Sequence, residues 1–157
     1  IALTKIRYLT YNLNMRKNNA VALMSRIRAK ANRFIIESLV AEGIEGIVPS
    51  HGEIMIHLFA EKDYTMQELA QKINRTKPTV TILVSKLVNY GYVKKKKSIT
   101  DNRVTYIKLT PLGIALKPVF ENISKDLNKI IYKGLSDTDA EKLEILLNNI
   151  SENFTEQ

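Results

Sequence analysis

Apolar residues at helical spacing predict a long helix near the start of the chain. Gly43 follows the last of these positions, and a glycine just beyond a periodic segment is a common helix stop. We therefore expect a helix over residues 18–42. Its apolar positions fall three or four apart and form one stripe, and they are Val21, Met24, Ile27, Ala31, Phe34 and Ile35.

Two motifs with the same spacing predict the starts of the next two helices. The segments "SHGE" (residues 50–53) and "TMQE" (residues 65–68) each place a hydroxyl three residues before a carboxylate. In a capping box the hydroxyl accepts from the backbone of the fourth residue, and the carboxylate reaches back to the first. Ser50 and Glu53 should therefore open the apolar helix "EIMIHLFA", and the second box should open "MQELAQKI".

A further helix and a hairpin follow. Pro78 suits a first helical turn, and Gly91 ends the periodic segment. The segments "YVKK" and "RVTYIKLT" then have the alternation of paired strands. The inward stripe of the helix from Lys77 to Tyr90 consists of Val80, Leu83, Val84 and Leu87.

Two helices complete the predicted order. Thr110 and Pro111 begin a long helix to about Lys133, and Pro118 inside it should bend it because proline removes a backbone donor. Beyond Gly134, Ser136 and Asp139 begin a last helix. The prediction is six helices and one hairpin: a mainly α protein with a small β-hairpin wing. A helix, a short turn, a helix and a hairpin, in that order, are typical of a winged helix-turn-helix lobe.

Charge is concentrated in one part of the chain. The net charge of the 157 residues is +8, and residues 65–110 hold ten Lys and Arg against two acids, so this block carries the whole excess. A localised positive field attracts polyanions, although a solvated basic face with no partner has the same composition. The first 36 residues are also purely basic, and they could face DNA or pair with acidic C-terminal helices of a partner chain.

Several function classes are disfavoured by composition. Without cysteine there is no disulfide, thiolate metal site or thiol switch. No apolar stretch reaches the roughly 18 to 20 residues that span a bilayer, so we expect a cytoplasmic protein with no membrane partner; residues 1–14 precede Met15 and leave an unusual leader open. His51, His57 and Glu53 could contribute to a metal site, but surface or core-edge positions suit them better. No catalytic set or Gly-rich phosphate loop is evident, so we expect no enzyme, no required cofactor and no metal.

The outer face of the helix over residues 77–90 is small, polar and basic, and it has no acid. Such a face can enter a major groove without repelling phosphates, and an exposed Ile82 could meet a thymine methyl. An ordinary amphipathic helix facing water has the same pattern. The candidate DNA-contacting residues are Thr76, Lys77, Pro78, Thr79, Thr81, Ile82, Ser85 and Lys86.

The hairpin raises a separate question, because a carboxylate follows four consecutive lysines. About half of the lysines can point at DNA, since strand residues alternate faces. Asp101 could accept hydrogen bonds from the Arg103 guanidinium and hold that side chain extended. Alternatively, Asp101 and Asn102 are simply turn residues. The candidate wing residues are Lys95, Lys96, Lys97, Thr100, Asp101 and Arg103.

The segment from Glu68 to Gly113 resembles the MarR (multiple-antibiotic-resistance regulator) family of bacterial transcriptional regulators. The resemblance lies in Leu69-Ala70, in Val80, Leu83 and Leu87, in Gly91 before the wing, in Asp101-Asn102-Arg103, and in Leu109-Thr110-x-x-Gly113. The flanking helices fit the family over nearly the whole chain beyond about residue 18. Lysines stand where many members have an arginine at the wing entry, which favours phosphate contact over base reading.

The resemblance implies one domain over residues 1–157, with dimerisation helices at about 18–45 and 110–157 and a DNA-binding lobe at about 50–109. It also implies a homodimer on a pseudo-palindromic double-stranded DNA operator, more often a repressor than an activator, and a small-molecule effector pocket between the dimer helices and the lobes. The absence of cysteine excludes the thiol-oxidation sensing of one branch. Two alternatives stay open: a winged module that binds protein or RNA, and a small enzyme.

Overall fold

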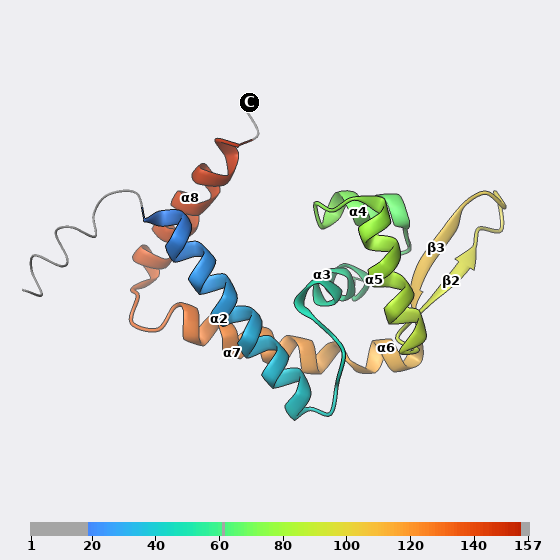
Figure 1. Ribbon diagram of the computed structural model, residues 1–157, viewed down its shortest axis with the longest axis horizontal. Coiled ribbons are helices and arrows are strands. Elements are labelled where there is room, and N and C mark those ends of the chain that lie inside the picture. The colour runs from blue at the N-terminus through green and yellow to red at the C-terminus, as the bar shows by residue number, and fades with distance from the viewer. Residues whose placement is uncertain (1–18, 61, 155–157) are drawn as a thin grey trace, which may run out of the picture.

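The computed structural model describes residues 19–60 and 62–154, which form two parts joined end to end (Figure 1). Helices α2, α7 and α8 lie at one end, and a lobe of α3, α4, α5 and a small sheet lies at the other. The elements in chain order are α2 (Ala20–Ala41), α3 (Pro49–Leu58), β1 (Tyr64–Thr65), α4 (Met66–Lys72), α5 (Lys77–Asn89), β2 (Val93–Lys97), β3 (Thr105–Leu109), α6 (Pro111–Ala115), α7 (Lys117–Ile131) and α8 (Asp137–Glu152). The predicted mainly α fold with a β-hairpin is confirmed.

The lobe has a continuous apolar core. The stripe predicted for α5 is buried: Val80, Val84 and Leu87 are fully enclosed, and Leu83 is half-buried. Ala70 on α4 is also buried, where a small side chain lets the two helices approach closely. The other fully enclosed side chains of the lobe include Ile54, Met55, Leu69, Val93 and Ile107.

The hairpin belongs to a three-stranded antiparallel sheet in the order β1-β3-β2. The sequence predicted β2 and β3, but β1 was missed: Tyr64 and Thr65 pair with Ile107 and Tyr106. Two residues are too few for alternation to be visible in a sequence. β3 is therefore the central strand, and β1 and β2 are the two edge strands.

One predicted capping box is correct and the other is wrong. At α4, Thr65 Oγ1 accepts from the Glu68 N–H at 3.2 Å, and the Glu68 carboxylate accepts from the Thr65 N–H at 2.7 Å. At α3, however, the helix begins at Pro49 and its N-cap is Val48. Proline at the first position fixes the start two residues earlier than predicted, and the side chain that reaches back is His51, not Glu53.

The single long helix predicted from Thr110 to Lys133 is divided in two. Thr110 caps α6, and α7 begins at Lys117, with Leu116 between them. Pro118 therefore lies in the first turn of α7, where its missing N–H needs no partner, instead of bending the interior of a helix. The predicted last helix is confirmed: Ser136 caps α8 and accepts from the Asp139 N–H at 3.2 Å.

The base of the hairpin is fixed tightly to α6. The Thr110 hydroxyl lies 2.5 Å from the Gly91 carbonyl oxygen and 3.2 Å from that of Tyr92. A Cβ at Gly113 would lie 2.0 Å from the Tyr92 carbonyl oxygen, so only glycine allows this approach. Gly91 itself has a φ of +76°, which closes α5 and directs the chain into β2.

Helices α2, α7 and α8 bury little of their apolar surface within one chain. The predicted α2 helix and its stop at Gly43 are confirmed, but Leu39 is its only buried residue, Phe120 is the only one on α7, and α8 has none. Val21 is 72% exposed and Ile145 is 59% exposed. Within the described ranges, no helix combines the length and apolar character needed to cross a bilayer.

Candidate nucleic-acid interface

Helix α5 exposes nearly all of the residues predicted to contact DNA. Among the eight candidates, Ser85 is half-buried and the other seven are exposed; Ile82 is 62% exposed. No acidic residue lies on α5. The buried stripe thus turns the small, polar and basic face outward, as the sequence predicted.

The threonines of this face already have local partners. Thr76 caps the helix by accepting from the Thr79 N–H at 3.5 Å, and the two hydroxyls lie 2.9 Å apart. Thr81 donates its hydroxyl proton to the Lys77 carbonyl oxygen at 2.8 Å. The Thr81 side chain therefore presents the acceptor lone pairs of its hydroxyl and its methyl group to the outside. The lone pairs suit a base-edge amino group, and the methyl group suits a thymine methyl.

The wing lysines divide between the two faces of the hairpin. Lys95 pairs with Ile107 and Lys97 with Thr105, on the face that also carries Val93. Lys96 lies on the opposite face, paired with Tyr106. All of these lysines are exposed, so the hairpin presents positive charge on both sides. Lys94 and Lys108 are cross-strand neighbours with like charges. Asp63, whose carboxylate lies 2.6 Å from Lys108 Nζ, reduces the electrostatic repulsion between them.

The wing tip is a hydrogen-bonded turn. The Asp101 carboxylate accepts from the backbone N–H of Arg103 at 2.9 Å, and Ser98 Oγ accepts from the N–H groups of Thr100 and Asp101 at 3.3 Å each. The expectation that Asp101 holds the Arg103 guanidinium is therefore wrong, and the turn interpretation of the Asp-Asn pair is confirmed. A carboxylate closes an Asx turn at short range more readily than it reaches a long flexible side chain. Thr100, Asp101 and Arg103 are all exposed.

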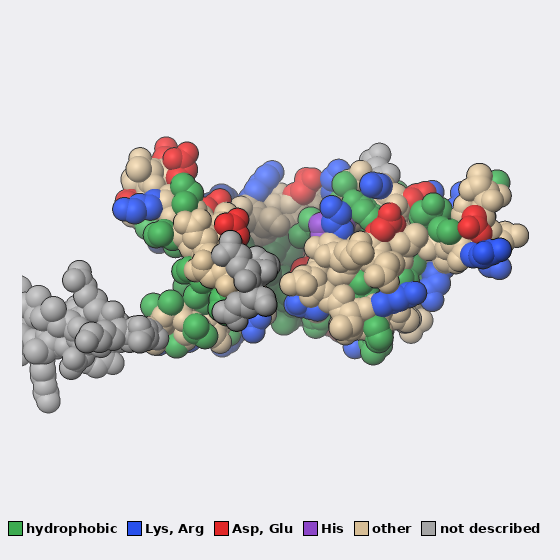
Figure 2. Space-filling view, turned by 90° about the horizontal axis from the view of Figure 1, so that it is seen from above, with side chains coloured by type: hydrophobic (Ala, Val, Ile, Leu, Met, Phe, Trp, Pro, Cys, Tyr) green, Lys and Arg blue, Asp and Glu red, His purple; other side chains and the backbone are tan. Residues whose placement is uncertain are grey.

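The α5 face and the hairpin lie next to each other in space. The Tyr92 N–H donates to the Leu87 carbonyl oxygen at 3.0 Å, so α5 leads directly into β2, and the hairpin projects beyond it (Figure 1). In the view of Figure 2, Lys and Arg side chains are spread over the lobe and reach the far end of the hairpin. We refer to the candidate residues of α5 and of the hairpin together as the α5–wing surface.

Two basic residues beside this surface were not among the candidates. Arg75 and Lys72 line a hollow of about 380 Å³ with Glu53 and His57. Arg75 Nη2 lies 3.9 Å from Glu53 Oε2, so the guanidinium–carboxylate pair expected in the wing occurs instead at the turn between α4 and α5. Only the charge count pointed to these residues, because their partner lies on a different helix.

The candidate metal residues have other roles in the described part of the chain. His51 is buried, and its Nδ1 accepts from the Val48 N–H at 3.1 Å. Burial is the main cause that lowers the pKa of His51, and the charge of Lys86 adds to it. His57 packs edge-on against Tyr64 with ring centroids 6.3 Å apart. Among residues 19–60 and 62–154, no group of three or more His, Asp or Glu side chains is placed to hold a metal ion.

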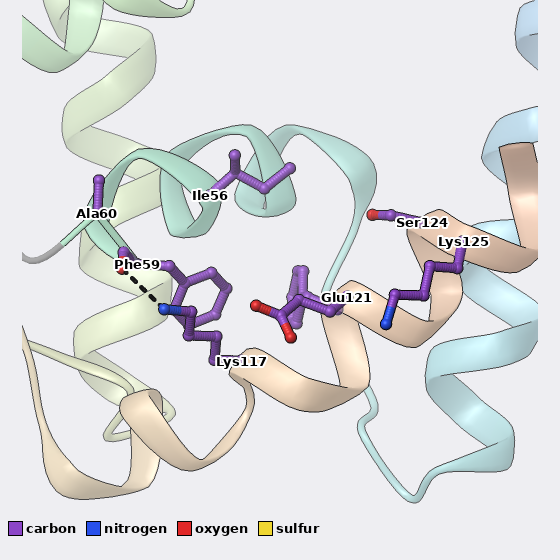
Figure 3. A pocket seen from close by; sticks show the side chains of 8 residues that line it. Ile56, Phe59, Ala60, Lys117, Glu121, Ser124 and Lys125 are labelled. Atoms are coloured by element: carbon purple, nitrogen blue, oxygen red, sulfur yellow. Dashed lines mark hydrogen bonds between the residues drawn. The ribbon is translucent and has the colours of Figure 1, made fainter.

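Two adjoining cavities lie between the lobe and the long helices. One of about 210 Å³ is enclosed by α2, α3 and α7 and is largely apolar. The other, of about 420 Å³, opens beside the end of α3 (Figure 3). There Lys117 Nζ donates to the Phe59 carbonyl oxygen at 3.5 Å, and the rings of Phe59 and Phe120 meet edge-on at 5.5 Å. Residues shared by the two cavities are Ile56, Phe120 and Ser124.

Comparison with known proteins agrees with this geometry. The model of the MarR family matches residues 47–105. The uncharacterized HTH-type transcriptional regulator YdgJ of Bacillus subtilis is 26% identical over 106 residues, covering 68% of this chain and 63% of that relative, which is less than two thirds of its length. The HTH-type transcriptional regulator MhqR of the same organism is 27% identical over 69% of this chain and 74% of its own. The fold is similar to that of S. aureus MepR, solved as a DNA complex, with a TM-score of 0.79 at 22% identity over 87% of this chain and 99% of the other.

Proposed function

We propose that the chain is a member of the MarR family, whose model matches residues 47–105, and that it is a sequence-specific regulator of transcription that binds double-stranded DNA. It acts in the cytoplasm as a homodimer on a pseudo-palindromic operator, as a repressor that responds to a small molecule. Catalysis has no part in this function. The curated relatives are both named as HTH-type transcriptional regulators, and MepR was solved bound to DNA.

The observation that carries this proposal is the α5–wing surface. A helix with an exposed, acid-free face and a basic hairpin beside it can place the helix in a major groove while the hairpin follows the adjacent backbone or minor groove. Lysines on both faces of the hairpin suit phosphates on either side of a groove. Arg103, at the tip, is the side chain best placed to reach furthest.

The dimer is supported by the apolar side chains left exposed on α2, α7 and α8. Contiguous apolar surface on a protein of this size marks an interaction site. A second copy supplies the same faces, and two-fold symmetry would set two lobes about one helical turn of DNA apart.

The two cavities support the response to a small molecule. Their lining comes from both the lobe and the long helices, so an occupant would act on the angle between these parts. Such an effector lowers DNA affinity only if it binds better to a dimer whose lobe spacing misfits the operator. Neither a metal nor a cofactor is required for this scheme.

The test is selection of duplex fragments from random DNA by the purified protein. We expect enrichment of an inverted repeat, with affinity that falls steeply as salt rises. A shuffled duplex of equal length is the matched control. Equal affinity for both duplexes, or preference for single-stranded RNA or a protein partner, would remove operator recognition from the proposal. The strands of the described wing carry one aromatic side chain, the half-buried Tyr106, which offers little surface for RNA stacking.

A further inference from the structure

His51 is the one buried polar or charged side chain among the residues that the structure describes, at 1% exposure. It lies in the first turn of α3, three residues after the N-cap Val48. Its Nδ1 accepts from the Val48 N–H at 3.1 Å, which is the contact that the side chain of the third helical residue makes with the N-cap in a capping box. The imidazole therefore fixes the corner at which the chain enters the lobe.

The protonation state of His51 follows from these contacts. Because Nδ1 accepts a hydrogen bond, the neutral ring carries its proton on Nε2. Nε2 is buried and meets no acceptor in the described part of the chain. A second proton on Nδ1 would face the Val48 N–H, donor against donor, and would leave a cation without any acceptor. The site thus fits the neutral imidazole only.

The charged groups around the ring favour the same state. On α5, which packs against α3, Lys86 acts on the imidazole and opposes a positive charge there. Glu53, two residues along α3, is engaged by Arg75. On α4, the Glu68 carboxylate is engaged by the Thr65 N–H. No carboxylate among these is directed at the ring to neutralise it.

We propose that His51 is a positioning residue for α5. While its imidazole is neutral, His51 maintains the packing that holds α5 in the orientation needed to bind DNA. The inference rests on the proposed function for its consequence, since α5 is the helix proposed to read the groove. A charged imidazole would have to leave its buried site. That movement would release the Val48 cap and disturb the packing of α3 under α5, where Ile54 and Met55 lie.

The direction of the effect follows from linkage. Burial and Lys86 lower the pKa of His51 below its ordinary value of 6.5, whereas the unfolded chain keeps that value. Below about pH 6.5 the unfolded state binds a proton that the folded state excludes, so stability falls as pH falls. The loss levels off once pH passes below the pKa of the folded state. Acidification should therefore weaken the packing of α5 against α3 and lower the affinity for the operator.

The test compares the full-length wild type with His51→Asn and His57→Asn. Asparagine can offer an acceptor near the position of Nδ1 but does not titrate. His57 is the other histidine of the chain and is partly exposed, so His57→Asn is the matched control. Operator affinity, thermal stability and amide exchange of α5 are measured at pH 7.5 and 5.5, and imidazole nitrogen shifts are followed by NMR.

We expect wild type and His57→Asn to lose operator affinity at the lower pH, with faster amide exchange along α5. His51→Asn should show neither change. NMR should report the proton of neutral His51 on Nε2 and a titration midpoint below the ordinary histidine value of 6.5. If His51→Asn does not fold, Lys86→Gln replaces it, read by NMR alone: removing the nearby charge should move the His51 midpoint to higher pH.

The proposal fails if His51 titrates at or above the ordinary histidine value of 6.5, if its neutral proton is on Nδ1, or if His51→Asn keeps the full pH dependence. Failure of the proposed function is distinguishable, because NMR and α5 amide exchange need no DNA. Absence of operator binding at both pH values, with the expected pH-dependent exchange, would reject DNA recognition while supporting the role of His51 in seating α5.

Discussion

In the winged lobe, apolar residues of α3, α4 and α5 pack against one another, whereas those of α2, α7 and α8 largely face outward. The lobe encloses Leu69, Val84 and Leu87 completely, but α8 buries no residue at all. The core of the lobe is thus complete within one chain, whereas much of the apolar surface of the long helices is left exposed. In the proposed dimer, the lobe can hold its shape alone, and its spacing relative to a second lobe depends on the partner.

The largest effect should come from charging the outward face of α8. Ile145 is 59% exposed in one chain, and Ile145→Glu would place a carboxylate on the face that a second copy covers in the proposed dimer. An unpaired buried charge costs roughly 3 kcal/mol or more, so dimerisation should weaken at least about a hundredfold, and operator binding with it. Light scattering and DNA titration measure both.

Asn148→Glu adds the same charge to the same helix and is the matched control for Ile145→Glu. A dimer that survives Ile145→Glu unchanged would show that this face of α8 is not the dimer contact.

Removing a core side chain of the lobe should act on the fold of a single chain. Leu87→Ala would leave a cavity in a site of 0% exposure, and such changes cost about 2–5 kcal/mol. Urea denaturation followed by circular dichroism should show this loss at any protein concentration. A loss that disappears at high concentration would mean that the lobe, too, depends on the dimer.

A third change should act on DNA alone. Arg103→Ala at the wing tip should weaken operator binding by about 1–3 kcal/mol if the side chain enters a groove. Because Arg103 is exposed and its backbone N–H makes the turn contact, stability should not change. Fluorescence anisotropy at fixed salt measures the affinity, with Asn102→Ala as the neighbouring control. Unchanged affinity would exclude Arg103 from the site.

The smallest effect should come from the cap of α4. Thr65→Ala removes the acceptor for the Glu68 N–H, which costs about 0.5–2 kcal/mol. The bonds from Thr65 lower the pKa of Glu68, so their contribution is present above the ordinary carboxyl pKa and is lost as the solution becomes more acidic. Thermal denaturation should show Thr65→Ala less stable than wild type at pH 7, and both should lose stability at pH 3.5, because the backbone N–H of residue 65 that donates to the Glu68 carboxylate remains in the variant.

Features set by local chemistry could be predicted from the sequence. The α5 stripe, the Thr65 box and the stops at Gly43 and Gly91 depend on residues a few positions apart, and the structure confirms them. The exposed α5 face followed from the same periodicity, because burial of one stripe leaves the other outside.

Features set by contacts between distant segments could not be predicted. The two-residue β1 exists because Tyr64 meets Ile107 across the sheet. Glu53 was assigned to a cap, but Arg75, more than twenty positions away in the sequence, pairs with it. The capping role of His51 accompanies its burial, which a sequence pattern does not reveal. Assignment of individual residues to DNA contacts stays a prediction.

The tight fit of Gly113 against Tyr92 has a mechanical consequence. The base of the wing and α6 are in such close contact that they cannot slide past each other, so they move as one rigid unit. Any change in the tilt of the lobe must then be absorbed elsewhere, at Leu116 between α6 and α7 or in the connection between α2 and α3, where Gly43 and Gly46 both have positive φ. The wing would therefore rotate by the same angle as α6 whenever α6 rotates.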